Sequence, residues 1–170
     1  MTELVVRRLL IDLSTPFAAR WNGGDAFRSA FFNALSMSFP VGEQYFIDSV
    51  RAGLKLLAPD QREKFATEVQ GFIGQEATHR RLHGLFNAQL DKLGFANRIE
   101  RRAQARIERN KGFDARMHVA ATAATEHFTA IFADWMLRHP EAFELLDHSD
   151  AGAWFFRVNR ENLPVAVTTG

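Results

Sequence analysis

The segment from Gly74 to His83 contains the residues that are best suited to binding a metal ion. Glu76 and His79 lie three residues apart in it, and His83 follows four residues later. Residues at this spacing are neighbours on one face of a helix, where a carboxylate and an imidazole can bind the same metal. Surface pairs and buried hydrogen-bonded pairs also use a helical Glu-x-x-His, so further acidic residues are needed to favour a metal.

Two more glutamates occur where solvated residues are not expected. Glu43 is surrounded by aromatic and aliphatic residues, and Glu126 lies in the most apolar segment of the chain. A buried carboxylate is costly unless it is paired, protonated or bound to a cation, and a metal would satisfy both residues. For Glu43, the alternative is stabilisation by a helix dipole. For Glu126, the alternative is a salt bridge to Arg80 or Arg116.

Helices must position these residues, because apolar side chains recur three and four residues apart along most of the chain. Asp25 is a suitable N-cap for a first helix, and Pro40 is expected to end it. A second helix should begin at Pro40, carry Glu43 in its first turn and end at Pro59. The longest helix is predicted over residues 60–93.

Two more helices are predicted after Gly94. Residues 97–111 are rich in Arg and Glu, which indicates an exposed helix, whereas residues 113–137 are apolar on most sides. The second pattern is typical of a helix buried in the middle of a bundle. The chain is thus divided into an extended arm (1–22), a helical bundle domain (23–149) and an irregular tail (150–170).

Composition limits the chemistry and the partners of the chain. The absence of cysteine excludes thiolate metal sites, iron–sulfur clusters and disulfides, which leaves carboxylate, imidazole and water as ligands. Twenty-one Lys and Arg residues nearly balance twenty Asp and Glu residues, so neither a nucleic acid nor an anionic membrane surface is expected as a partner. No apolar run approaches the roughly 20 residues of a membrane span, and a cytoplasmic location is expected.

The order Glu43, then Glu76 with His79, then Glu126, on three separate helices, is most of the pattern of dimetal four-helix bundles. The chain also resembles the bacterial family of predicted metal-dependent hydrolases, which is similar to ferritin-like dimetal proteins. The resemblance covers roughly residues 20–137 and is carried by Trp21, Asn33 to Ser36, Phe39, Pro40, Gly42, Glu43, Phe46, Phe72 to Glu76, His79, His83, Asn87, and Glu126 to Thr129.

This resemblance implies an all-α, ferritin-like bundle with a long central helix. It implies metal ligands at Glu43, Glu76, His79 and Glu126, with His83 nearby. Two neighbours of these residues are further candidates for a supporting role or an extra ligand, namely Gln75 and His127. His118 is expected at the surface. The phenylalanines are expected mainly in the core, and some of them in a substrate pocket.

One departure from the family pattern concerns the C-terminus. The pattern has a final helix with a second Glu-x-x-His, but this chain reads Arg160, Glu161, Asn162, Leu163, Pro164, and proline cannot bind a metal. The last helix is therefore expected to be missing, truncated or altered. Glu161, His127, His148 or a partner chain are the alternative sources of a ligand.

Three functions are compatible with these residues. The first is a di-iron or iron–manganese oxidase or oxygenase that acts on an apolar small molecule, with bridging carboxylates. The second is a hydrolase in which zinc or manganese activates a water. The third is a non-catalytic module for metal storage or interaction. Iron is the expected metal, with manganese and zinc as alternatives, and the many phenylalanines predict a homodimer.

Overall fold

The structure of the protein, a computed structural model, describes residue 13 and residues 16–139. These residues form four helices and no strand, so the predicted all-α class is confirmed. The helices are α1 (Ala26–Lys55), α2 (Pro59–Lys92), α3 (Arg98–Asn110) and α4 (Ala115–Arg138). The predicted tail, most of the predicted arm, Pro140, His148, Glu161 and Pro164 lie outside the described residues.

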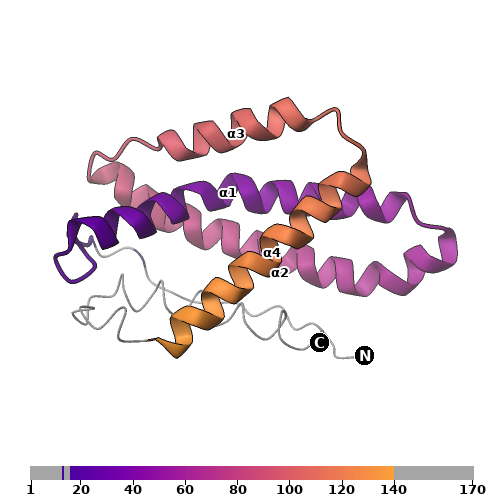
Figure 1. The fold of residues 1–170 in the computed structure, drawn as a ribbon, viewed down its shortest axis with the longest axis horizontal. Helices are drawn as coiled ribbons and strands as arrows, with labels where there is room; N and C mark the ends of the chain where they lie inside the picture. The colour runs from indigo at the N-terminus through magenta and orange to yellow at the C-terminus, as the bar shows by residue number, and fades with distance from the viewer. Residues whose placement is uncertain (1–12, 14–15, 140–170) are drawn as a thin grey trace.

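The two long helices α1 and α2 form an antiparallel pair, α3 runs beside α1, and α4 crosses the pair obliquely (Figure 1). The predicted long central helix is α2, which has 34 residues. The helix expected in the basic segment after residue 97 is α3. No described helix is long and apolar enough to cross a membrane.

Local sequence explains where most of these helices begin and end. The side chain of Asp25 accepts a hydrogen bond from the backbone N–H of Arg28, as an N-cap does. Gly94 has a φ of +84°, a left-handed conformation that glycine adopts without strain, and it follows the end of α2. The predicted N-cap at Asp25 and the predicted helix end at Gly94 are both correct.

The predicted helix break at Pro40 is wrong, because α1 continues through this residue. A proline inside a helix has no N–H, which leaves the carbonyl oxygen of the residue four positions earlier without its donor. That residue is Ser36, and the Nδ2 atom of Asn87 donates to its carbonyl oxygen at 3.1 Å. The side chain from α2 thus replaces the missing backbone donor.

The continuity of α1 changes the position of Glu43. It lies in the interior of a 30-residue helix and not in a first turn. The effect of a helix dipole falls off beyond the first turn, so this effect does not account for the buried carboxylate.

The prediction that α4 is buried on most sides is also wrong for the described residues. Its inner face carries the buried residues Thr122, Ala133 and Met136, while large apolar residues on other faces are exposed. The inner face is joined to α1 by a hydrogen bond of 2.6 Å between the Ser49 and Thr122 hydroxyl groups. Beside it, Gly53 allows Val119 to approach α1 closely.

The main apolar core lies where the N-terminal half of α1 packs against the C-terminal half of α2. Trp21 closes this core, and its Nε1 atom donates to the Asn33 side chain at 2.8 Å. The core position predicted for the phenylalanines is correct for Phe32, Phe46 and Phe86, but Phe31 and Phe128 are exposed. The core residues are Leu13, Trp21, Phe32, Met37, Leu82, Phe86, Leu90, Ala133 and Met136.

Candidate metal site

Three of the four predicted ligands come together between α1 and α2. Glu43, Glu76 and His79 are all buried, and each offers one ligand atom within 4.8 Å of the other two. We call these three residues the ligand cluster. Glu76 and His79 are one helical turn apart, with 3.5 Å between Glu76 Oε1 and His79 Nδ1. Glu43 reaches the same point from the interior of α1.

The carboxylates of the ligand cluster have oxygen atoms that no protein group satisfies. Glu43 Oε2 and Glu76 Oε1 are buried and have no hydrogen-bond partner. A buried polar atom without a partner is destabilising, and two carboxylates side by side add repulsion when both are ionised. A divalent cation would remove both costs, and carboxylate with imidazole is a ligand set suited to manganese, iron and zinc. The residues present therefore fit a metal.

The pKa values of the acidic groups reflect the same conflict. Burial raises the pKa of Glu43 well above its ordinary value, and the nearby carboxylates of Glu76 and Glu126 raise it further, while Arg80 acts in the opposite direction. Without a cation, Glu43 favours the protonated form. Binding of a metal must then displace protons.

Glu126 lies beside the ligand cluster but is not one of its three closely spaced residues. It projects from α4, is half-buried, and has a pKa raised to about 8 by burial and by the charge of Glu76. The predicted alternative, a salt bridge to an arginine, is wrong for the described residues. Arg80 instead donates to Gln44, and Arg116 lies 3.9 Å from Asp114.

His83 contacts the ligand cluster from a fully buried position on α2. Its Nε2 atom is 3.9 Å from Glu43 Oε1, and its ring packs edge-on against Phe39. Burial lowers the pKa of His83 well below its ordinary value, and His79 lowers it further, so the ring is neutral. The structure places His83 next to Glu43, where the family resemblance implied it.

The hydrogen bonds around His83 assign its tautomer. The Ser36 hydroxyl donates to Asn87 Oδ1 at 2.9 Å, so it must accept from His83 Nδ1, which is 3.0 Å away. With the proton on Nδ1, the lone pair of Nε2 faces Glu43. Ser36 and Asn87 were not assigned a role from the sequence. The feature of the sequence that could have indicated them is that both are polar residues at positions of a helix that are expected to be buried.

The structure does not bring the other candidate residues into the ligand cluster. His127 is exposed and its ring lies against Phe128, so the supporting role expected for it is not seen. Gln75 is half-buried next to Glu76. His118, which was expected at the surface, is half-buried, and its Nδ1 atom is 2.8 Å from the Tyr45 hydroxyl, so that this contact joins α4 to α1.

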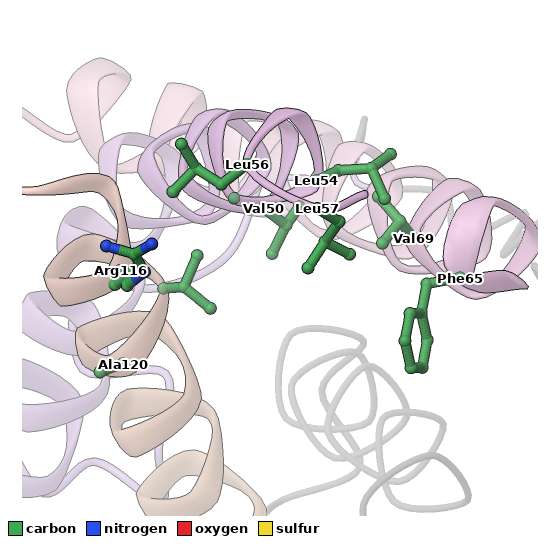
Figure 2. Close-up of a pocket in the computed structure, with 10 residues that line it drawn as sticks. Val50, Leu54, Leu56, Leu57, Phe65, Val69, Arg116 and Ala120 are labelled. Carbon is green, nitrogen blue, oxygen red and sulfur yellow. The ribbon is translucent and has the colours of Figure 1, made fainter. Parts of the chain in front are cut away.

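An apolar groove of about 510 Å³ lies along the same three helices as the acidic residues. Val50, Val69 and Val119 each line it, and each is seven residues from Glu43, Glu76 or Glu126 on its own helix. Seven residues are two turns, roughly 10 Å along a helix axis. Figure 2 shows Val50, Leu54 and Leu57 on one wall, Phe65 and Val69 along another, and Arg116 at one end.

A comparison with known protein families agrees with the geometry of this site. Residues 5–156 match the family described as predicted metal-dependent hydrolase. The chain belongs to this family. The family resemblance that the sequence suggested is thus confirmed, and the ligand cluster is a group of residues that could hold a metal ion. No curated protein and no solved structure matches the chain.

Proposed function

We propose that this protein is a metal-dependent hydrolase that holds a divalent cation with Glu43, Glu76 and His79. The observation that carries the proposal is the pair of buried, unsatisfied oxygen atoms on Glu43 and Glu76, with His79 within reach of both. The family membership supports hydrolysis over oxygen chemistry. Manganese, iron and zinc all accept this ligand set, and zinc and manganese need no redox partner to activate water.

Each residue of the site has a role in the proposed reaction. A bound divalent metal supplies the lowered pKa of a water and the polarisation of a substrate oxygen. Glu126 projects from α4 beside the ligand cluster and would accept the proton of that water on its carboxylate. The water oxygen would then bond to the substrate carbonyl carbon, the bond from that carbon to the leaving oxygen or nitrogen would break, and Glu126 would return the proton to this leaving group. Ser36 holds the ring of His83 through its Nδ1 atom, and the neutral Nε2 atom of this ring lies beside Glu43 at 3.9 Å.

The groove favours a substrate with an apolar chain. Its described walls consist mainly of aliphatic and aromatic side chains, and among the described residues that line it Arg116 is the charged one. A volume of about 510 Å³ is within the range of sites for small organic ligands. We therefore expect esters or amides with an apolar acyl group to be better substrates than short polar ones.

Metal content and ester hydrolysis test the proposal together. Purified protein is loaded with Mn²⁺, Zn²⁺ or Fe²⁺, and nitrophenyl esters of short and medium acyl chains are the substrates. Glu76→Gln and His79→Ala should each lower metal affinity by about tenfold or more. Glu126→Gln should keep the metal and lose turnover. Glu68→Gln, at an exposed position on α2, is the matched control and should change neither.

The outcomes separate the three functions that the sequence left open. Retention of metal by both Glu76→Gln and His79→Ala would overturn the site. A di-iron oxidase would instead give a visible absorption transient when oxygen or peroxide is added to the anaerobic ferrous protein, and the carboxylate-rich ligand set is the observation in its favour. Less than one metal per ten chains under all loading conditions would favour a non-catalytic module.

A further inference from the structure

The outward face of α4 carries a regular apolar stripe that nothing in the described part of the chain covers. Its members are spaced alternately by four and three residues along the whole helix, and all of them are exposed. They are Met117, Ala121, Ala124, Phe128, Ile131 and Trp135. Of the four large side chains, Met117 is 60% exposed, Phe128 71%, Ile131 53% and Trp135 45%. This alternation is the heptad spacing by which one helix packs against another.

The stripe is separate from the face that holds the site. Glu126 follows Met117 by nine residues, which places it about 180° around the helix. The buried residues Thr122 and Ala133 lie on the same side as Glu126. The stripe thus lies on the face of α4 opposite to the face that contacts α1. In Figure 1, α4 is the helix that crosses the others.

The sizes of the residues in the stripe vary in a way that suits one particular partner. The C-terminal half has the bulky Phe128, Ile131 and Trp135, and the N-terminal half has two alanines and a methionine. In two antiparallel copies of α4 related by a two-fold axis at the level of residue 126, Phe128 faces the partner's Ala124. In the next layers Ile131 faces the partner's Ala121, and Trp135 faces the partner's Met117. Each large residue then meets a smaller one.

Charge follows the same register at the two ends of the stripe. Arg138 lies three residues after Trp135, and Asp114 lies three residues before Met117, so both continue the spacing of the stripe. In the antiparallel pair, Arg138 faces the partner's Asp114, so opposite charges meet at both ends. Both side chains are largely exposed, although Arg138 also bonds Asp134 at 2.9 Å and Asp114 Oδ1 accepts from the backbone N–H of Arg116 at the start of α4.

From this register we propose that the protein forms a homodimer through antiparallel pairing of α4 with the α4 of a second copy. An isologous contact requires a surface that is complementary to itself, and the stripe has this property in both size and charge. A different helical partner would need no such internal match. The two ligand clusters of the dimer lie back to back, on the far faces of the paired helices.

The test exchanges a large and a small residue of one layer. The association constant is measured by sedimentation velocity on the full chain at micromolar concentration. Ala124→Phe places two phenylalanines against each other, and Phe128→Ala leaves a gap, so each should weaken the dimer by about tenfold or more. The double variant A124F/F128A restores one large and one small residue in each layer and should recover most of the association.

Charge provides an independent test of the same register. Arg138→Asp should weaken the dimer, and adding Asp114→Arg should restore it, because the pair at each end is then reversed. Circular dichroism and metal content report that each variant is folded, since Glu126 lies on the other face. A monomeric wild-type protein would overturn the proposal. So would single variants that dimerise as well as the wild type, or a double variant no stronger than the single ones.

Discussion

At the level of single residues, the carboxyl group of Glu126 links the candidate metal site to the stability of the protein. Its pKa is raised to about 8 in the folded chain, from an ordinary value of 4.5. The unfolded chain therefore releases this proton at lower pH than the folded chain does. The stabilising contribution of the protonated group is complete below about pH 4.5 and is lost as the pH rises to about 8.

A pH series on metal-free protein checks this sign. In the presence of a chelator, the free energy of unfolding from urea titrations should fall more steeply with pH for the wild type than for Glu126→Gln across this window. His83 contributes the same dependence to both proteins, so it cancels in the difference, whereas the part of the raised Glu43 pKa that Glu126 causes is lost in the variant and changes the slope in the same direction. Parallel curves for the two proteins would contradict a raised pKa of Glu126 in the folded chain.

The sequence predicted the residues of the site better than their contacts. Spacing alone placed Glu76 and His79 on one face, and burial of a carboxylate in an apolar segment pointed to Glu43. The bonds of Ser36 with His83 and Asn87 could not be predicted, because they join residues 47 and 51 positions apart on two helices. Such pairings depend on how the helices pack.

At the level of elements, the passage of α1 through Pro40 depends on a hydrogen bond from α2. Asn87→Ala removes the donor to the Ser36 carbonyl oxygen and should lower the free energy of unfolding by about 1–3 kcal/mol. Pro40→Ala restores a backbone N–H to that oxygen. The cost of Asn87→Ala should therefore be smaller in a Pro40→Ala background, which denaturation of all four proteins measures as a coupling energy. Additive effects would contradict this explanation.

The crossing of α4 over α1 depends on Gly53. A Cβ atom at this position would lie 2.5 Å from the Cγ2 atom of Val119, so Gly53→Ala forces the two helices apart. We expect a loss of about 1–3 kcal/mol, which exceeds the gain of about 1 kcal/mol from helix propensity. The matched control is Gly84→Ala, where no atom lies within 4 Å and the propensity gain should appear alone. Thermal denaturation distinguishes the opposite signs.

The helix boundaries show where sequence rules succeed and where they fail. Asp25 and Gly94 act locally, within one turn, and both positions were predicted correctly. A proline usually ends a helix, which predicts a break at Pro40, but Asn87 on another helix prevents this break. A local rule fails when a distant side chain supplies the missing bond.

At the level of the whole molecule, the ligand cluster should couple metal binding to folding. A metal that binds only the folded chain stabilises it by about 2.7 kcal/mol when its concentration is 100 times the Kd. Mn²⁺ or Zn²⁺ should therefore raise the melting temperature of the wild type and of the control Glu68→Gln. The melting temperature of Glu76→Gln should not respond. An equal rise in all three proteins would place the metal elsewhere.

The exposure of one face of α4 could not be predicted from the sequence. Its apolar composition on most sides predicted burial within one chain, whereas the described structure exposes the stripe from Met117 to Trp135. Periodicity identifies which faces of a helix are apolar but not what covers them. A second copy of the chain would satisfy the same pattern.

The equal offset between the groove and the acidic residues also constrains how this chain can change. Val50, Val69 and Val119 stand seven positions from Glu43, Glu76 and Glu126. On all three helices the groove residue and the acidic residue are therefore separated by the same two turns. Loss of a single residue within any of these intervals would turn one valine about 100° away from its partners. Length variation is therefore tolerable in the connections between helices and excluded from these three heptads.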